Sequence, residues 1–376
     1  MKMRDEMNDF KSEKYAPIQC SSTITLMECL KLMDQRRRKL FLVFSENEYA
    51  GMISIGDIQR AIINNIPLTS PVAAVIKKDQ IVAYSDDPKE EVLQLMQTIR
   101  SEFMPIIERI SGSLEDVLFW DEMFPQTKLQ KRHTPLSLPV VIMAGGKGSR
   151  LKPITNILPK ALIPIGEKTI METIMDRFVA TGCSEFHISV NYRAEMIRQY
   201  FNTLNNDDYQ ISYFTENKPL GTAGSLFLLR NTISTTFFVT NCDIIIEQDF
   251  QEIYKYHHSN NNEITLVAAI KNYHIPYGTV VSGENGLLTE MSEKPELAFL
   301  INSGLYILEP HLLQEIPENT LFHITELIDK VKTRGGRVGV FPVSEGAWVD
   351  IGEWPEYVKT VRGLFGHDSD HFKGIK

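Results

Sequence analysis

A glycine-rich loop follows a short apolar run in this chain, and two cations follow the glycines. The glycines are Gly145, Gly146 and Gly148, and the cations are Arg150 and Lys152. Glycine has no Cβ, so the backbone N–H groups of such a loop can approach an anion closely. Arginine can hold a phosphate through two parallel hydrogen bonds. The stretch therefore predicts a cradle for a polyphosphate.

Two common phosphate-loop patterns do not fit this stretch. The loop reads G-G-x-G-S-R, so it lacks the spacing of the Rossmann pattern G-x-G-x-x-G. It also lacks the G-K-[ST] ending that a Walker A loop requires. A purely structural glycine turn remains an alternative, which the adjacent Arg150 and Lys152 disfavour.

The elements around the loop alternate between strands and helices, which is typical of an α/β fold. Thr169 and Glu172 have the spacing of a capping box that opens a helix, and Gly182 is expected to end it. In a parallel α/β sheet, ligands bind at the carboxyl ends of the strands, where this loop begins. Strands are expected at residues 140–143, 185–190, 209–214, 236–240, 264–270, 306–308 and 337–341.

The chain before the loop is long enough to form a separate module. Residues 128–138 are rich in charged and polar residues and prolines and lack an apolar period, so we interpret them as a linker. This linker separates residues 8–127 from residues 139–366. The order helix, strand, turn, strand occurs twice in the first part, which predicts two copies, at about 15–68 and 71–127.

The first copy contains Gly51-Met52-Ile53-Ser54-Ile55-Gly56-Asp57, and this stretch resembles the pattern of CBS domains. The resemblance covers both copies and implies a tandem CBS module that builds a dimer. It also implies that Ser54 and Asp57 bind the phosphate or ribose of an adenine nucleotide. The second copy departs from the pattern, because Leu118 stands where the family has Ser or Thr, three positions before Asp121. A module that only packs and dimerises, with no ligand, remains an alternative.

Residues 144–151, AGGKGSRL, resemble the G-G-x-G-[ST]-R-L signature of the sugar-1-phosphate nucleotidyltransferases. The resemblance covers about residues 139–365 and implies a Rossmann-like, GT-A-like α/β domain with a mixed, mainly parallel sheet. Further motifs of that family follow in order: PKAL at 159–162, LGTAG at 220–224, NCD at 241–243, EKP at 293–295, NSGLY at 302–306 and WVDIG at 348–352.

The resemblance also implies a reaction, in which an NTP and a sugar 1-phosphate give a nucleotide sugar and pyrophosphate. Arg150 would hold the pyrophosphate end of the NTP, and Lys160 would neutralise the α-phosphate. Lys294 would hold the sugar phosphate. Asp243 and Asp350 would share one Mg²⁺, a hard cation that prefers carboxylate and phosphate oxygens.

The same resemblance implies two sets of binding residues. The NTP is expected to contact Ala144, Gly145, Gly146, Gly148, Ser149, Arg150, Glu216, Gly221 and Thr222. The sugar phosphate is expected to contact Asn191, Glu293, Lys294 and Asn302.

Glu216 bears on the choice of nucleotide base. An ionised carboxylate only accepts hydrogen bonds, and guanine offers adjacent N1–H and N2–H donors. This matching favours GTP over the other nucleotides, which remain open. The combination of an N-terminal CBS pair with such a transferase resembles a group of bacterial enzymes of surface-sugar synthesis. From this resemblance we expect glucosamine 1-phosphate as the acceptor, which would give GDP-glucosamine for legionaminic acid.

Other functions remain alternatives. One is a mannose-1-phosphate guanylyltransferase or another nucleotide-sugar pyrophosphorylase. Another is a non-catalytic nucleotide-binding regulator, and a third is a scaffold for a partner enzyme.

Charge, hydropathy and cysteine distribution indicate the expected compartment and exclude some partners. The net charge of −9 disfavours general nucleic-acid binding. No apolar run approaches a membrane span, no signal peptide is expected, and the scattered cysteines favour free thiols, so we expect a cytoplasmic protein. The resemblance to a CBS pair implies a homodimer or higher oligomer. The pair His257-His258 is interpreted as polar residues at the C-terminal end of a helix and not as a metal site.

Overall fold

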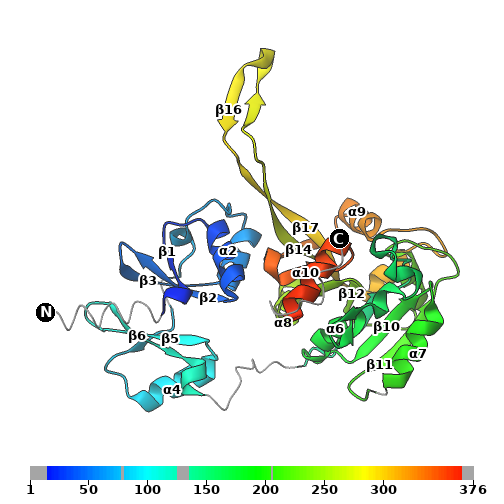
Figure 1. Ribbon diagram of the computed structural model, residues 1–376, viewed down its shortest axis with the longest axis horizontal. Helices are drawn as coiled ribbons and strands as arrows, with labels where there is room; N and C mark the ends of the chain where they lie inside the picture. The colour runs from blue at the N-terminus through cyan, green and yellow to red at the C-terminus, as the bar shows by residue number, and fades with distance from the viewer. Residues whose placement is uncertain (1–14, 78–79, 125–134, 205, 366–376) are drawn as a thin grey trace. The chain divides into compact units, whose positions relative to one another are not determined.

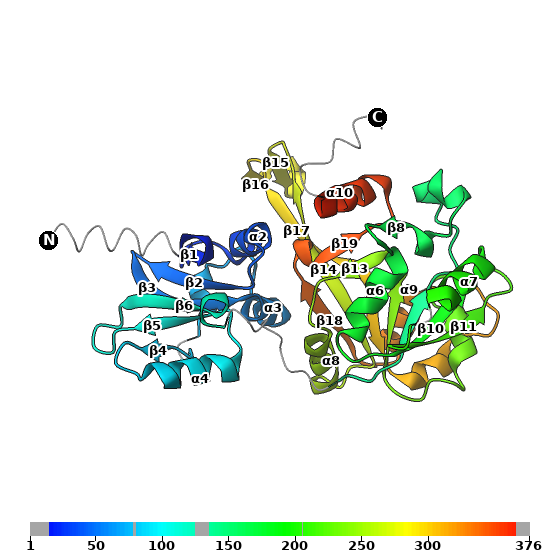
Figure 2. The same cartoon turned by 60° about the horizontal axis from the view of Figure 1, so that its bottom comes forward.

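The computed structural model describes residues 15–77, 80–124, 135–204 and 206–365. These residues form two compact units, one on each side of the stretch 125–134 (Figures 1 and 2). The predicted linker 128–138 therefore lies mostly outside the described residues. Among the described helices, none is both long and apolar enough to cross a membrane.

The first unit contains two three-stranded sheets with the same pairing. In each, the first strand runs parallel to the second, and the second is antiparallel to the third. The first sheet comprises β1 (Gln19–Ser21), β2 (Leu40–Ser45) and β3 (Glu48–Ser54), and the second comprises β4 (Ala83–Tyr84), β5 (Phe103–Ile107) and β6 (Leu114–Phe119). The helical segments are η1 (Ala16–Ile18), α2 (Leu26–Arg36), α3 (Ile55–Ile63), η2 (Val72–Ala74), α4 (Lys89–Ile99) and α5 (Trp120–Met123).

The second unit is built on a seven-stranded sheet with the order β11-β10-β7-β12-β17-β14-β18. Only β17 runs antiparallel to its neighbours among these paired strands, so the predicted mixed, mainly parallel sheet is confirmed. The strands are β7 (Val140–Met143), β10 (Glu185–Val190), β11 (Gln210–Thr215), β12 (Phe237–Asn241), β14 (Ile264–His274), β17 (Glu296–Leu308) and β18 (Val338–Val343).

Helices cover both faces of this sheet. Consecutive residues of β12 show why, since Phe237 and Phe238 point to opposite faces and both are fully buried. The predicted capping box is present, because the Thr169 hydroxyl accepts from Glu172 N–H at the start of α6. The helices are α6 (Ile170–Val179), α7 (Ala194–Leu204), α8 (Phe250–Ser259), α9 (Ile324–Thr333) and α10 (Trp354–Phe365).

Short elements complete the unit and carry much of the candidate site. The two-stranded ribbons are β8 (Pro164–Ile165) with β9 (Lys168–Thr169), β13 (Ile244–Ile246) with β19 (Trp348–Asp350), and β15 (Thr279–Ser282) with β16 (Leu288–Ser292). The 3-10 turns are η3 (Ser149–Leu151), η4 (Ile154–Asn156), η5 (Lys160–Leu162), η6 (Gly224–Leu229), η7 (Glu284–Gly286), η8 (Pro310–Glu315) and η9 (Glu345–Ala347).

An arm, defined here as residues 271–300, projects from the second unit (Figure 1). Its base is the continuation of β14 and β17, which stay paired as far as His274 and Glu296, and its tip is the β15–β16 ribbon. The expected strands 264–270 and 306–308 were too short for this reason. Cross-strand hydrogen bonds extend the ladder beyond the part that the core buries.

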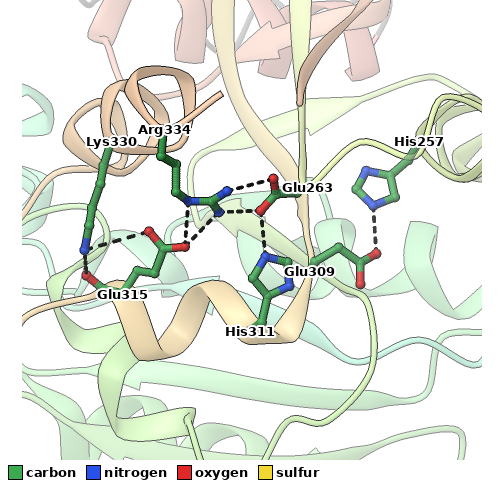
Figure 3. A network of polar contacts seen from close by, with 7 residues as sticks. All are labelled: His257, Glu263, Glu309, His311, Glu315, Lys330 and Arg334. Carbon is green, nitrogen blue, oxygen red and sulfur yellow. Dashed lines mark hydrogen bonds and ion pairs between the residues drawn. The ribbon is translucent and has the colours of Figure 1, made fainter. Parts of the chain in front are cut away.

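A polar network joins η8, α9 and the start of β14 (Figure 3). The Arg334 guanidinium donates to Glu315 and Glu263, and His311 Nε2 lies 2.7 Å from Glu263 Oε2. The hydrogen bond from Arg334, with help from His311, lowers the pKa of Glu263 to about 2. Glu263, His311 and Glu315 lie close enough together to hold a metal ion, but Arg334 already bonds both carboxylates.

His257 is part of the same region and corrects one expectation (Figure 3). Its ring is 2% exposed, with Nδ1 2.8 Å from Thr265 Oγ1 and Nε2 3.0 Å from Glu309 Oε1. Burial lowers the pKa of this imidazole. His257 is therefore a buried structural residue in the last turn of α8 and not an exposed residue at the end of the helix.

Candidate active site

A pocket of about 410 Å³ opens at the carboxyl ends of β7 and β12. The two ends meet there because Met143 of β7 pairs with Asn241 of β12 in parallel register. Eight of the predicted NTP-binding residues line this nucleotide pocket: Gly145, Gly146, Gly148, Ser149, Arg150, Glu216, Gly221 and Thr222. Ala144 is not among its described lining residues, since it is buried in the sheet and its N–H donates to Ser189 O.

Two glycines of the loop have different roles. Gly148 has a φ of +63°, and a Cβ there would come within 2.8 Å of Thr155 Cγ2, so the turn itself requires glycine. Gly146 would place a Cβ with no described atom inside 4 Å, although its backbone lines the pocket. The loop thus presents bare backbone to the pocket at Gly146, as the sequence predicted.

A second pocket, of about 340 Å³, adjoins the first. Arg150, Thr222, Asn241 and Asp243 line both pockets, so a molecule in one would meet a molecule in the other along these side chains. The second pocket also takes in Asn302, Gly304, Tyr306, His323, Trp348 and Asp350. The predicted sugar-phosphate residue Asn302 therefore lies in it.

Asp243 and Asp350 meet at the second pocket through the β13–β19 ribbon. Ile244 pairs with Asp350 in that ribbon, and Ile351 N–H donates to Asp243 O at 2.8 Å. Lys160 Nζ donates to the Asp243 carboxylate, and both side chains are mostly buried. The predicted cation and both predicted metal ligands are thus brought together.

Gly352 is the contact point of these three groups. A Cβ at this position would lie 2.7 Å from Asp350 Oδ1, 2.8 Å from Asp243 Oδ2 and 2.9 Å from Lys160 Nζ. The Gly352 N–H donates to Asp350 Oδ1 at 2.7 Å. A side chain larger than hydrogen would therefore displace the carboxylates.

The donor set fits a hard divalent cation. Burial raises the pKa of Asp350, and the nearby charge of Asp243 raises it further, while the Gly352 N–H opposes both effects. Two carboxylates that repel each other in a half-buried site are stabilised by a cation, and carboxylate oxygens suit Mg²⁺.

Arg150 lies at the open rim of both pockets. Its Nη1 donates to Glu353 Oε1 at 3.0 Å, and both side chains are more than half exposed. Such an exposed pair contributes little to folding stability, so the guanidinium is available to an incoming phosphate. The neighbouring thiol of Cys242 is unsuited to be a nucleophile, because burial raises its pKa to about 12.

Three predicted sugar-phosphate residues lie elsewhere. Asn191 stands on the nucleotide side, where its Nδ2 donates to Glu216 O at 2.7 Å. Glu293 and Lys294 are exposed on the arm and are not among the described residues that line either pocket. The reason is that β17 begins at Glu296, and about 20 Å of extended strand then separates Glu296 from Asn302.

Several pocket residues were not predicted as site residues. Asn241 and Tyr306 lie within quoted motifs, and Tyr306 OH donates to Asn302 Oδ1 at 2.9 Å. Gly304 makes room for Asn241, since a Cβ there would lie 2.6 Å from Asn241 Nδ2. His323 gave no signal in the sequence, because it reaches the pocket only as the residue before α9.

Ser54 and Asp57 have a structural role in the first unit. They form a capping box at the start of α3, where Asp57 Oδ2 accepts from Ser54 N–H at 2.9 Å. The Asp57 carboxylate also pairs with Arg60 and with Lys77. A nucleotide at this position would have to share these groups with the cap.

Comparisons with known proteins identify a family match in each of the two units. The nucleotidyl transferase family matches residues 139–364, and the CBS domain matches residues 13–64. A UTP–glucose-1-phosphate uridylyltransferase of Synechocystis sp. is 31% identical over 61% of this chain and 63% of its own length. A mannose-1-phosphate guanyltransferase of Schizosaccharomyces pombe is 32% identical over 58% of this chain and 62% of its own.

A solved structure of HddC from Yersinia pseudotuberculosis aligns with 61% of this chain and all of its own, at 24% identity and a TM-score of 0.49. This chain spans less than two thirds of the length of the two curated relatives. The family match covers more than half of the chain, together with its loop, its paired aspartates and its two pockets. The chain belongs to the nucleotidyl transferase family and carries a CBS domain before the transferase domain.

Proposed function

We propose that the protein transfers a nucleoside monophosphate from an NTP to a sugar 1-phosphate, releasing pyrophosphate. The observation that carries the proposal is the shared wall of the two pockets. Arg150 and Asp243 line both, so two phosphorylated substrates bound there would meet at a cation and a carboxylate. Both curated relatives are named for reactions of this class.

In the proposed reaction, a phosphate oxygen of the sugar 1-phosphate attacks the α-phosphorus of the NTP. The bond to the β-phosphate breaks, and pyrophosphate leaves with that electron pair. Lys160 would neutralise charge at the α-phosphate, and Arg150 would hold the departing pyrophosphate. Asp243 and Asp350 would hold Mg²⁺, which would supply further charge neutralisation.

The nucleotide is proposed to be GTP. Glu216 is 8% exposed on the wall of the nucleotide pocket and offers carboxylate oxygens to the N1–H and N2–H of guanine. The curated relatives include guanylyl- and uridylyltransferases, so the base choice rests on this side chain.

The acceptor is proposed to be glucosamine 1-phosphate. Polar groups of Asn302, Tyr306 and Asp350 in the second pocket suit hydroxyls and an amine. The product, GDP-glucosamine, would serve bacterial surface sugars such as legionaminic acid, made in the cytoplasm. Mannose 1-phosphate is the alternative acceptor, supported by the name of the Schizosaccharomyces pombe relative.

A homodimer is proposed, with the arm as one contact. Ten large apolar side chains between Tyr273 and Leu300 are 41–74% exposed. Neighbours such as Val280 and Val281 point to opposite faces, so the transferase domain could cover at most one face. The exposed apolar area is on the order of 1,000 Å², and a stable interface needs about 800 Å² from each partner. We propose a second copy of this chain as the partner, because it is always available wherever the protein is made.

The CBS module is proposed to bind an adenine nucleotide at Ser54 and Asp57 and to regulate the transferase. A regulator or scaffold without activity is the competing function. The paired aspartates favour the enzyme, since a sensor of nucleotides does not need them.

Exchange of labelled pyrophosphate into GTP tests the reaction. It should depend on both a sugar 1-phosphate and Mg²⁺, and Lys160→Ala should remove it. Glu247→Gln, which changes an exposed carboxylate paired only with Arg177 among the described ion pairs, is the matched control. Exchange that persists unchanged in Lys160→Ala would contradict the assignment of this site.

A further inference from the structure

The Glu216 side chain is fixed at both carboxylate oxygens by groups that belong to the protein. Ser189 Oγ donates to Glu216 Oε1 at 2.6 Å, and Leu220 N–H donates to Oε2 at 3.3 Å. Each oxygen of a carboxylate has two lone pairs, so each retains one for a further donor. Glu216 lines the nucleotide pocket, so its carboxylate can offer these remaining acceptor sites to a bound base.

The backbone of Glu216 is fixed as well. It follows β11 directly, its N–H donates to Val190 O at 3.3 Å, and its C=O accepts from Asn191 Nδ2 at 2.7 Å. Gly145 leaves room for the carboxylate, because a Cβ there would lie 3.2 Å from Glu216 Oε1. The carboxylate is therefore held in one place before any nucleotide binds.

Ser189 is the least expected of these partners. It is fully buried in β10, where it pairs with Met143, a residue that lines the nucleotide pocket. A serine could serve the fold alone by satisfying a buried carboxylate. Its donation to one specific oxygen also sets the rotation of the carboxylate plane, which decides whether two parallel donors of a base can reach both oxygens.

We infer that Ser189 is a positioning residue for base selection, which holds the Glu216 carboxylate so that it accepts from both N1–H and N2–H of guanine. The inference rests on the proposed function for the choice of base. It adds a residue of β10 outside the predicted site. Loss of the Ser189 hydroxyl should weaken discrimination for the 2-amino group of guanine more than it weakens nucleotide binding in general.

Binding of GTP and ITP, which lacks the 2-amino group, separates these roles. Calorimetric affinities of the full-length protein are measured for wild type, Ser189→Ala and Ser189→Cys, whose thiol is somewhat larger than the hydroxyl and is a weak donor. Wild type should prefer GTP by about tenfold or more, since a lost hydrogen bond to a charged acceptor is worth at least that. Ser189→Ala should bring the ratio close to one, and Ser189→Cys should lie between.

Glu216→Gln provides the second arm of the test. It should lower the GTP/ITP ratio by itself, and adding Ser189→Ala should lower the ratio little further, because both changes act on one carboxylate. A purely structural serine would weaken the binding of GTP and ITP equally and leave their ratio unchanged. That result would overturn the inference, while preferential GTP binding by the wild type would still support the guanylyl proposal. A wild-type protein that binds neither GTP nor ITP would overturn the guanylyl proposal together with it.

Discussion

Asp243 and Asp350 lie side by side because Ile244, the residue after Asp243, is the cross-strand partner of Asp350. The ribbon that joins them also brings Lys160 to the same point. Two carboxylates at a phosphate site predict a shared cation. We expect Asp243→Asn and Asp350→Asn each to lower kcat by about 100-fold or more, because removing a charge-stabilising group typically costs this much.

Pyrophosphate release measured over a range of Mg²⁺ concentrations checks this prediction. The variants should need more Mg²⁺ for their residual activity, and both should remain folded at the assay temperature, as the Glu247→Gln control does. Full activity in either variant at low Mg²⁺ would exclude the shared site.

The loop glycines provide a pair of matched variants. Gly146→Ala should fold normally, since its Cβ meets no described atom within 4 Å, but should weaken NTP binding about tenfold by blocking close approach to the backbone. Gly148→Ala should instead destabilise the fold by about 1–3 kcal/mol, because its φ of +63° and the contact with Thr155 both oppose a side chain. Denaturant unfolding and NTP titration separate the two effects. Equal loss of stability in both would refute this division.

Lys294 is predicted to bind the sugar phosphate, although it lies on the arm and does not line either pocket. As a ligand of the sugar phosphate, Lys294→Ala should raise the KM for the sugar 1-phosphate by about tenfold or more while the KM for the NTP changes little. Lys359→Ala, which changes an exposed lysine of α10, is the control. An unchanged KM would place sugar-phosphate binding entirely on the residues of the second pocket.

The arm predicts association of two copies. Replacing Leu288 and Met291, both more than 60% exposed, by glutamate should reduce the sedimentation mass of the full-length protein, because charges would be buried at the contact. Ile110→Glu, at an exposed apolar residue of the first unit, should leave it unchanged. Identical mass for the arm variant and the wild type would show that the arm is not an interface.

The network at Arg334 predicts a pH dependence of folding stability. The pKa of Glu263 is about 2 in the folded protein and near 4.5 when unfolded, so its contribution is complete above pH 4.5. That contribution is lost as the pH falls from about 4.5 to 2. Glu263→Gln should cost about 1 kcal/mol at pH 7, after allowance for solvent screening, and less at pH 3. Urea unfolding at the two pH values measures it, and a cost that grows on acidification would contradict the sign.

The sequence predicted the sheet and its loop because local patterns determine them. The strand at Val140–Met143 and the helix after Thr169 depend on apolar runs and a capping box, which are visible in the chain. The extent of β17 is different, since its outer half is exposed and pairs with the outer half of β14. No local pattern shows how far such a ladder runs.

The residues of the candidate site also divide into those that local motifs predict and those that tertiary packing positions. Residues within motifs, such as Arg150, Lys160 and Asp243, lie together as the order of motifs implied. His323 and Ser189 reach the site through tertiary packing, which places a helix start and a buried strand next to a pocket. Lys294 lies outside both pockets because the arm, and not its motif, sets its position.

Pyrophosphate release by the purified full-length protein tests the central claim most directly. Five NTPs would be combined with the 1-phosphates of glucosamine, mannose, glucose and N-acetylglucosamine, in the presence of Mg²⁺. The account predicts turnover that is highest with GTP and glucosamine 1-phosphate and that Asp243→Asn lowers by about 100-fold or more. No release with any pair, by a protein that still binds GTP, would contradict it and favour a non-catalytic regulator.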